Sequence, residues 1–218
     1  MPNDTFVMSV RQSAELDHAF ERNGWTPGDV KRLSIGAMLA DVLQVVRGNA
    51  EIKHYETFRE TGELTLHIPA LPAPTLEDIQ TKFNGRFSWV KSIERNTAPT
   101  EAVTLKLVTV LREDESKIVG AEYERRIAPH QDLILGFQQA AWLEEHQDEF
   151  PEFMALLGKI YIDFSGIVVV GDDGRRGVFC LDRDGGRWYL YYDWLVYGFG
   201  RDGRVASSSK QQTQPLAT

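Results

Sequence analysis

Apolar residues in the first 158 positions recur mostly every three or four residues, which is the spacing of a helix. Residues 13–22 carry this pattern and predict a first helix. Thr26 followed by Pro27 favours the start of a second helix. Ser34 is expected to cap a third helix that ends near Gly48. The third helix would carry an apolar stripe formed by Ile35, Met38, Leu39, Val42, Leu43 and Val46.

The middle of the chain mixes helical and strand-like patterns. Residues 64–68 alternate apolar and polar positions as a strand does, and the PALPAP segment at 69–74 then predicts a linker. A short helix is expected after Thr75, and the β-branched run at 104–111 predicts a strand. Two more helices are expected, over residues 131–146 and 148–157.

From Lys159 onward the period of the apolar positions becomes two. The runs KIYIDF, IVVV, GVFCL and RWYLYYDWL are separated by residues typical of tight turns. These turn signals are Ser165-Gly166, Asp172-Asp173-Gly174 and Asp184-Gly185-Gly186. The pattern predicts an antiparallel meander.

Together these patterns predict an α+β protein with a helical N-terminal half and a C-terminal antiparallel β-sheet. The sequence divides into a helical N-terminal region (1–68), a mixed helical region after the proline-rich linker (69–158), an antiparallel β region (159–206) and a polar tail (207–218). The low complexity of the tail predicts disorder.

The net charge of the chain limits the classes of molecule that it is expected to bind. The net charge is −8, whereas binding to nucleic acid or to an anionic membrane surface depends on clustered Lys and Arg. We therefore expect neither partner. The N-terminus lacks the features of a secretion signal, and no apolar run reaches the roughly 18 residues of a membrane span, so a soluble cytoplasmic protein is predicted. Cys180 is the only cysteine, which excludes an internal disulfide, and its apolar neighbours predict a buried thiol.

Residues 171–204 have an unusual composition. They hold eight of the chain's 18 Gly together with eight aromatic residues, six Arg and six Asp, but no Lys and no Glu. Such a composition is typical of a contact surface, because Tyr and Trp supply area at low rotamer cost while Gly and Asp supply turns.

Strand alternation indicates which of these residues would face a ligand. One face of the strand at 188–194 would hold Trp188, Leu190, Tyr192 and Trp194 in the core. The other face would display Tyr189, Tyr191 and Asp193, and the segment beyond it would add Val196, Tyr197, Arg201 and Asp202. The alternative interpretation is that all these aromatic residues fill the core of a sheet.

The same segment carries the pattern W-x-L-x-x-x-W-L-x-x-x-F-x-x-x-G-R-V-A, from Trp188 to Ala206. This resembles the end of the variable proteins of diversity-generating retroelements. In that family a reverse transcriptase copies a template with errors at adenines, and the copies rewrite codons near the 3′ end of a target gene. Codons for the intervening residues can be reached from AAC or AAT by changes at adenine alone, whereas Trp and Phe codons contain no adenine. These residues are Tyr189, Tyr191, Asp193, Val196, Tyr197, Gly198, Gly200, Arg201 and Asp202.

The resemblance implies a C-type-lectin-like scaffold that displays variable side chains to a ligand. The helical N-terminal part also resembles the leaders of uncharacterised bacterial proteins, which implies no mechanism.

Catalytic and metal-binding patterns are weak in this sequence. It contains no Gly-x-Ser-x-Gly elbow, no phosphate loop and no His pair at helical spacing, so we expect no catalytic residue, no metal and no cofactor. Asp182 and Asp184 begin like a calcium loop, but Arg187 occupies the position that requires Gly, so a hairpin turn is favoured.

We therefore predict noncatalytic recognition of an unidentified protein or carbohydrate ligand. One alternative is a carbohydrate-active or other hydrolase that uses Asp193 with a carboxylate such as Asp172 or Asp202 in an aromatic cleft. A second alternative is a protein-interaction module of a mobile element, in which an exposed apolar patch over residues 35–46 binds a partner.

Overall fold

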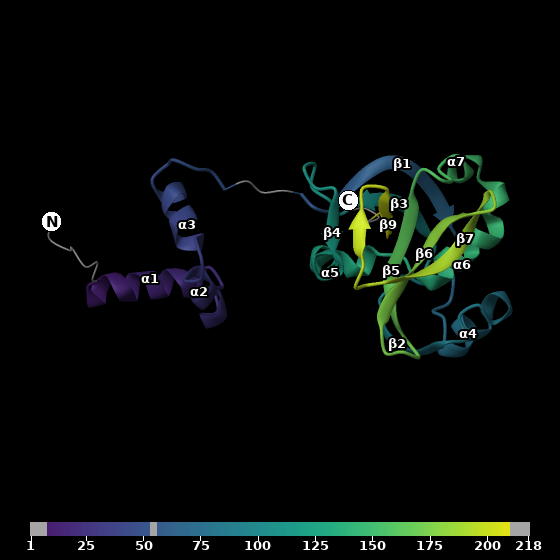
Figure 1. Ribbon diagram of the computed structural model, residues 1–218, viewed down its shortest axis with the longest axis horizontal. Coiled ribbons are helices and arrows are strands. Elements are labelled where there is room, and N and C mark those ends of the chain that lie inside the picture. Colours follow the sequence, from purple (N-terminus) through teal and green to yellow (C-terminus); the bar gives the residue numbers. More distant parts are fainter. Residues whose placement is uncertain (1–7, 53–55, 210–218) are drawn as a thin grey trace, which may run out of the picture. The chain divides into compact units, whose positions relative to one another are not determined.

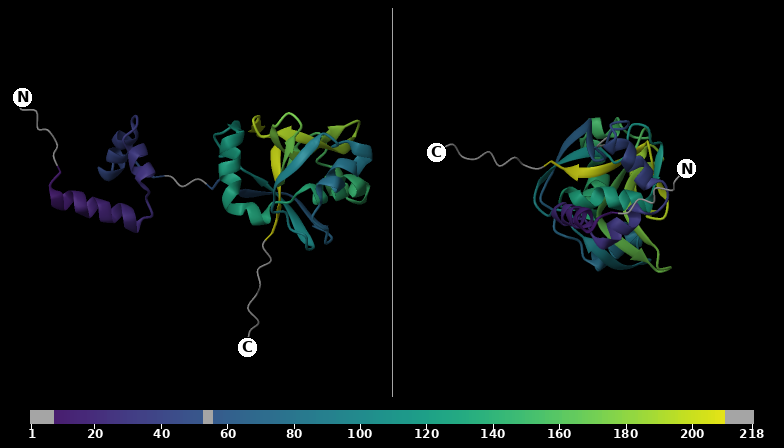
Figure 2. Two further views of the ribbon diagram at one scale, coloured as in Figure 1. Left: turned by 90° about the horizontal axis from the view of Figure 1, so that it is seen from below. Right: turned by 90° about the vertical axis from the view of Figure 1, so that its left-hand side faces the viewer.

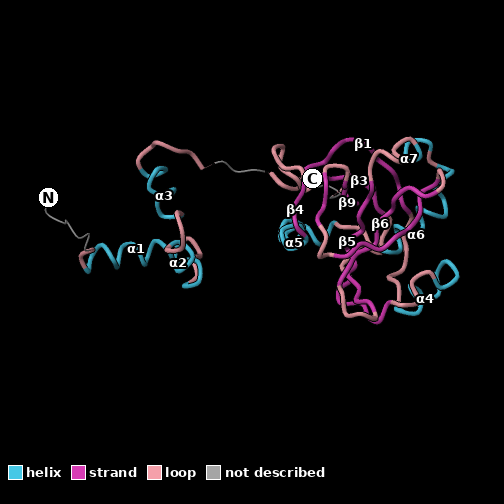
Figure 3. Tube along the Cα trace, in the orientation of Figure 1, coloured by secondary structure: helices cyan, strands magenta, loops and turns pink. Residues whose placement is uncertain are grey.

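The computed structural model describes residues 8–52 and 56–209 of the chain. The chain forms two compact units, which we call unit 1 (Met1–His54) and unit 2 (Tyr55–Thr218). Unit 1 is helical, whereas strands dominate unit 2 (Figure 3). The predicted boundary at residue 68 therefore differs from the division in the structure, and the PALPAP segment lies inside unit 2.

Unit 1 contains α1 (Val10–Arg22), α2 (Pro27–Leu33) and α3 (Met38–Val46). The predicted cap at Thr26 is confirmed, because its side chain accepts a hydrogen bond from the Asp29 amide while the Asp29 carboxylate accepts from the Thr26 amide. The third helix begins later than predicted. Gly36 adopts a φ of 66°, a left-handed conformation that interrupts a helix started at Ser34.

Unit 2 is built on a seven-stranded, mostly antiparallel sheet, in which the order β1-β3-β9-β5-β6-β7 is extended by β2 pairing with β5. Among the described strands of this sheet, β5 and β9 are the one pair that runs parallel. The strands are β1 (Arg59–Ile68), β2 (Val90–Asn96), β3 (Val103–Thr109), β5 (Tyr161–Gly171), β6 (Arg176–Asp184), β7 (Arg187–Trp194) and β9 (Gly203–Ser208). A separate two-stranded sheet joins β4 (Lys117–Val119) and β8 (Gly198–Gly200).

The predicted meander is confirmed for β5, β6 and β7, which pair antiparallel in chain order. The turn between β6 and β7 consists of Gly185 and Gly186, whose φ angles are 55° and 90°. Both values suit the two-residue hairpin loops that favour Gly. Asp184 and Arg187 close this loop as a cross-strand pair, so the hairpin interpretation of the Asp182–Arg187 segment is also confirmed.

One predicted turn is wrong, because Ser165 and Gly166 lie inside the continuous strand β5. A Cβ atom on Gly166 would come within 2.3 Å of the Ile134 carbonyl oxygen and 2.8 Å of the Leu135 carbonyl oxygen. The Gly166 amide donates to the Leu135 carbonyl at 2.9 Å. Glycine is thus needed here for close approach of another backbone, not for a turn.

That approaching backbone also interrupts the helix predicted over residues 131–146. The structure has a 3-10 helix, η1 (Ala128–Leu133), and then α6 (Phe137–His146). Between them Ile134 bridges Ser207, and the Leu135 amide donates to the Ala206 carbonyl at 3.0 Å. Tertiary pairing with the sheet has therefore overridden the helical pattern.

The other helices of unit 2 are α4 (Leu76–Gly85), α5 (Gly120–Ile127), the 3-10 helix η2 (Gln147–Glu149) and α7 (Pro151–Met154). Thr75 caps α4 as predicted, whereas the helix predicted over 148–157 is replaced by the short η2 and α7. Strands β2 and β4 and helix α5 were not predicted. Within the described residues, no helix is long and apolar enough to cross a membrane.

Both faces of the large sheet are covered, and in Figures 1 and 2 helices lie on either side of its strands. One core cluster packs around Phe164, Phe179 and Trp188 with residues of α6 and α7. The second packs around Val168, Val178 and Val205 with residues of α5, β4 and β8. Alternate residues of β5, β6 and β9 thus point into different cores.

The final strand extends into the region predicted to be a tail. Ser207 is buried and Ser208 ends β9, so the sheet includes the first residues of the predicted 207–218 segment. Positions 210–218 of that segment lie outside the described residues.

Candidate functional site

The candidate site begins with β7, the last strand in the sheet order, which has β6 as its neighbour on one side. On the other side, helix side chains bind its backbone. Gln147 accepts from the Trp188 amide at 2.7 Å and donates to the Trp188 carbonyl at 3.0 Å. Glu144 accepts from the Leu190 amide at 2.7 Å, and Arg86 donates to the Leu190 carbonyl at 3.2 Å. The edge of β7 is thereby capped.

Trp188 and Leu190 anchor β7 from within the core. Both side chains are buried, and the Trp188 ring stacks on Phe153 with centroids 4.8 Å apart. The Trp188 indole also donates to the Phe153 carbonyl at 3.1 Å. Their predicted core positions are confirmed.

Tyr189 and Tyr191 lie together on the opposite face of β7. Tyr191 is 38% exposed and Tyr189 is half-buried, and their ring centroids are 4.9 Å apart. The Arg86 guanidinium lies 3.6 Å from the Tyr189 ring centroid, a cation–π arrangement. Burial, and secondarily the Asp184 carboxylate, raises the pKa of Tyr191. Tyr189 and Tyr191 together form a partly exposed aromatic surface at the start of β7.

Tyr192 and Trp194 were predicted to lie in the core, but both are half-buried. They pack edge to face with centroids 4.5 Å apart, and Trp89 packs on both. The guanidinium of Arg175 lies 3.7 Å from the Trp194 ring centroid. The end of this strand face is therefore a partly exposed aromatic cluster formed by Trp89, Tyr192 and Trp194.

Asp193 lies between the outward tyrosines and the following turn, but it is half-buried. It pairs across the strands with the buried Val178. Burial raises the pKa of Asp193, while the Trp194 amide and the Lys117 ammonium act in the opposite direction. Asp193 is thus less available to a ligand than the prediction of full display implied.

Val196 and Tyr197 project from the turn that follows β7. The Tyr197 amide donates to the Trp194 carbonyl at 2.9 Å, which closes a four-residue turn. Leu195 is buried in this turn, whereas Val196 is 67% and Tyr197 53% exposed. The turn thus has one anchoring residue and two displayed residues.

Arg201 and Asp202 are exposed on the connection between β8 and β9. The Arg201 side chain donates from Nε to the Glu115 carbonyl at 2.9 Å. The Asp202 carbonyl accepts from the Tyr161 amide at 3.1 Å, which fixes the backbone of the connection. Both side chains can therefore reach a ligand from a held backbone.

The seven predicted residues thus form two groups. Tyr189 and Tyr191 lie at the start of β7, where Asp148 of η2 pairs with Arg187. Val196, Tyr197, Arg201 and Asp202 lie around β8, which pairs with β4, and Asp193 stands between the groups. In Figure 1, β7 and β4 carry labels on opposite sides of unit 2.

The hydrolase alternative requires an accessible carboxylate near Asp193. The carboxylate that interacts with Asp193 electrostatically is Asp163 of β5, which is 1% exposed and pairs across the strands with the buried Cys180. Burial, and then the charge of Asp193, raises the pKa of Asp163 well above its usual range. This pair suits a buried protonated acid better than a pair of solvent-facing catalytic groups. The predicted burial of the Cys180 thiol is confirmed.

Sequence reasoning missed the hollows in unit 2, two of which are lined by aromatic or by arginine side chains. One, of about 630 Å³, lies between the 71–74 loop, α4 and α6, and is lined by Phe83, Phe137 and Trp142. Phe83 has a φ of 53°, an uncommon conformation for a bulky residue. The other, of about 330 Å³, is lined by Arg59, Arg201 and further arginines. No local sequence signal identifies either hollow, because its residues come from distant segments.

Comparisons with protein-family models, with curated proteins and with solved structures find no match for this chain. In the part of the chain that the structure describes, no group of three or more His, Cys, Asp or Glu residues is arranged to hold a metal ion.

Proposed function

We propose that this protein is a noncatalytic binding protein that displays two groups of ligand-facing residues, Tyr189 and Tyr191 at the start of β7 and the residues around β8. The observation that carries the proposal is the way β7 is held. Buried Trp188 and Leu190 fix the strand from inside, and Gln147, Glu144 and Arg86 bind its backbone at the same two positions. The side chains at 189 and 191 form none of these hydrogen bonds, although the Tyr189 ring stacks on Arg86, so their exposed surface can serve recognition.

The separation of buried anchoring residues from displayed residues also supports a diversified surface. Six of the nine pattern residues are buried, and the other three, Trp194, Gly203 and Arg204, are half-buried. All the positions reachable by adenine changes are exposed or half-buried. A variable protein needs this separation, because the scaffold must stay folded while the ligand-facing residues change. We therefore propose that the chain is the variable protein of a diversity-generating retroelement. A C-type-lectin-like scaffold is part of this proposal, and the mostly antiparallel sheet with flanking helices is compatible with it.

The ligand would be a protein or a carbohydrate. The adjacent rings of Tyr189 and Tyr191 supply flat apolar area with hydroxyl groups at the rim, which suits either class. In the group around β8, Tyr197 supplies a further ring, and Arg201 and Asp202 supply charged hydrogen-bonding groups.

The genome around the coding sequence tests the diversification directly. We expect a reverse transcriptase gene nearby and a second copy of codons 188–206 that differs only where the copy holds adenine. A genome with neither feature would remove the retroelement from the proposal. The display surface would then be judged by its binding alone.

A second candidate function is partner binding by unit 1. All the large apolar residues of the predicted stripe on the third helix are more than 40% exposed. None of the described residues of α1, α2 and α3 is buried. Short helices gain most of their stability from packing, so this unit is expected to be completed by a partner protein.

A further inference from the structure

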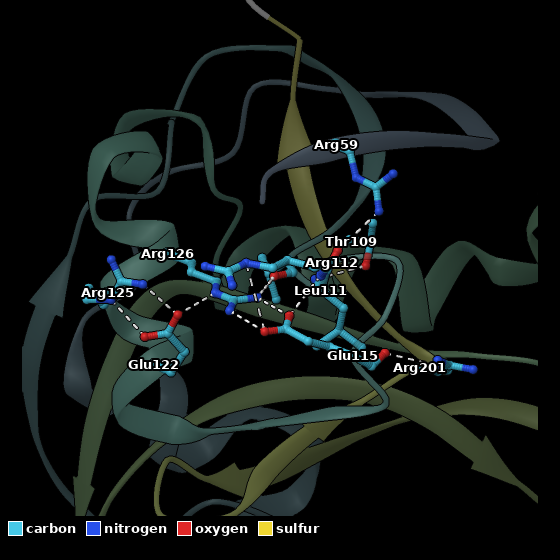
Figure 4. A network of polar contacts seen from close by, with 10 residues as sticks. Arg59, Thr109, Leu111, Arg112, Glu115, Glu122, Arg125, Arg126 and Arg201 are labelled. Carbon is cyan, nitrogen blue, oxygen red and sulfur yellow. Dashed lines mark hydrogen bonds and ion pairs between the residues drawn. The ribbon is translucent and has the colours of Figure 1, made fainter. Parts of the chain in front are cut away.

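The hollow of about 330 Å³ lies where β1 and the segment after β3 meet the β8–β9 connection. Arg59, Arg112, Arg201 and Arg204 line it, together with Glu113 and Glu115. Three of these arginines come from the scaffold, and Arg201 comes from the proposed display surface. In Figure 4, Arg112 and Arg201 lie near Glu115, and Arg59 lies beside Thr109 and Leu111.

Part of this charge is already neutralised within the protein. Buried Arg126 binds Glu115 through two nitrogens, with Nη2 at 2.7 Å from Oε1, and it also binds Glu122. The hydrogen bonds from Arg126 lower the pKa of Glu115 to about 2, so this carboxylate stays ionised. Arg204 is paired with Glu63, with its Nη2 at 2.7 Å from Oε1. Glu115 and Glu63 are therefore committed to partners inside the protein.

Arg59 and Arg201 have weaker internal partners. Arg59 donates to the Leu111 carbonyl at 3.2 Å and reaches Glu113 only at 3.5 Å. The side chain of Glu113 is 90% exposed, so solvent screens this contact. The buried Nε of Arg59 has no hydrogen-bond partner within the described chain. Arg201 donates from Nε to the Glu115 carbonyl, and its terminal nitrogens form no ion pair with a carboxylate of the described residues.

We propose that this hollow binds a carboxylate group of the ligand between Arg59 and Arg201. A guanidinium matches the planar carboxylate with two parallel hydrogen bonds, and both groups are already held by bonds to backbone carbonyls. Thr109 accepts a bond from the Leu111 amide, and its own hydroxyl proton can be donated to the same ligand. The inference deepens the proposed function and rests on it, because Arg201 belongs to the display surface.

The surroundings favour a carboxylate over a phosphate. Glu63, Glu113 and Glu115 lie in or beside the hollow, and a doubly charged group would meet stronger repulsion from them than a singly charged one. The net charge of −8 opposes any polyanion in the same way. A single carboxylate, from an acidic side chain or from a uronic acid, fits these constraints.

The test is an NMR titration of the full chain at constant ionic strength, followed through its backbone amides and arginine Nε–H signals. The ligands are N-acetylglutamate amide, glucuronate and inorganic phosphate. We expect saturable shifts at Arg59, Arg201 and the neighbouring β8–β9 amides with at least one carboxylate. Whether the peptide-like or the sugar acid binds more tightly identifies the source of the group.

Matched variants separate this site from general charge effects. Arg59→Gln and Arg201→Gln should each weaken carboxylate binding at least ten-fold. Arg125→Gln removes the same charge from an exposed residue that is paired with Glu122, and it should leave binding unchanged. Each variant is first checked for native dispersion of its amide signals.

Three results would overturn the inference: no saturable shift with either carboxylate, equal weakening by Arg125→Gln, or tighter binding of phosphate than of both carboxylates. None of them bears on the genomic test, so the carboxylate site and the diversified surface can fail separately.

Discussion

Gly198 and Gly200, two residues apart in β8, meet different surroundings. A Cβ on Gly198 would come within 2.6 Å of the Ile118 carbonyl oxygen, which belongs to the paired strand β4. A Cβ on Gly200 would meet only a side-chain oxygen of Asp202, at 2.8 Å, and that side chain is exposed and can move. Both codons are reachable by adenine changes, but only position 200 has room for variation.

We expect Gly198→Ser to destabilise unit 2 by about 1 to 3 kcal/mol, since overpacking forces the paired backbone to shift. Gly200→Ser should change the free energy of unfolding by less than about 0.5 kcal/mol, as is usual for surface sites. Urea unfolding of both variants checks this. Equal stability of the two would show that β4 and β8 are not packed as described.

Asp163 should make stability depend on pH. Its folded-state pKa is raised by burial, so the folded protein keeps a proton that the unfolded chain loses above its ordinary pKa of 3.8. The contribution of Asp163 to the free energy of unfolding is therefore fully present below pH 3.8. It is lost as the pH rises, by about 1.4 kcal/mol per pH unit, until the pKa of the folded state is reached. Glu115 and Glu122 have pKa values of about 2, so they make the free energy of unfolding depend on pH only at lower pH.

Asp163→Asn should remove this loss while keeping the shape of the side chain. We expect the variant to gain stability relative to the wild type as the pH is raised from 5 to 7. Urea unfolding at pH 5, 6 and 7 measures the difference. Parallel pH profiles for the two proteins would show that Asp163 does not carry a proton in the folded state.

Residue-level prediction from sequence succeeded where alternation alone decides burial. Trp188, Leu190 and Tyr191 follow the strand period, and their buried and exposed positions were predicted. Trp194 was predicted to lie in the core but is half-buried, because it is the last residue of β7, where its ring contacts Trp89 and Arg175 and not the buried core residues. Contacts from distant segments leave no trace in a period-two pattern.

Among the elements, β7 depends on helix side chains at its edge. Gln147→Ala would remove both bonds to the Trp188 backbone and leave a buried amide and carbonyl without partners. We expect a loss of about 2 to 4 kcal/mol, from two unsatisfied groups. Asp148→Ala is the matched control, since Asp148 forms only an exposed ion pair with Arg187 of the same strand.

Thermal unfolding followed by near-UV circular dichroism would measure both variants. The melting temperature should fall clearly for Gln147→Ala and remain almost unchanged for Asp148→Ala. A Gln147→Ala variant as stable as the control would mean that water replaces the glutamine at the strand edge.

Prediction of the elements was best where local signals and tertiary structure agree. The caps at Thr26 and Thr75 and the Gly185-Gly186 hairpin were all predicted from local chemistry. Prediction of the elements failed at Gly166 and at Ile134, because both residues contact segments that lie about 30 to 70 residues away in the sequence. A glycine needed for close approach cannot be distinguished by sequence from a glycine in a turn.

At the scale of the whole molecule, the two units differ in how they are stabilised. Unit 2 contains two apolar core clusters, whereas the described residues of unit 1 include no buried side chain. The sequence identified the helical character of the first part and the α+β class. The boundary predicted at residue 68 lies too far toward the C-terminus, because residues 59–68 form β1, whose partner strand β3 follows the PALPAP segment.

We expect residues 55–218 to fold alone with a urea midpoint close to that of the full chain. Residues 1–54 alone should lose most of their helicity, because short helices without a core are marginal in water. Circular dichroism of the two fragments measures this. An unfolded 55–218 fragment would show that unit 1 supports the sheet.

The central claim is that the chain separates a fixed scaffold from a surface that tolerates change. A saturation mutagenesis library scored for protease resistance tests it most directly. We predict that most substitutions at Tyr189, Tyr191, Val196, Tyr197, Arg201 and Asp202 leave the protein folded, whereas most at Trp188, Leu190, Leu195 and Phe199 do not. Equal intolerance of the two sets would contradict the claim, because the proposed ligand surface would then be part of the core.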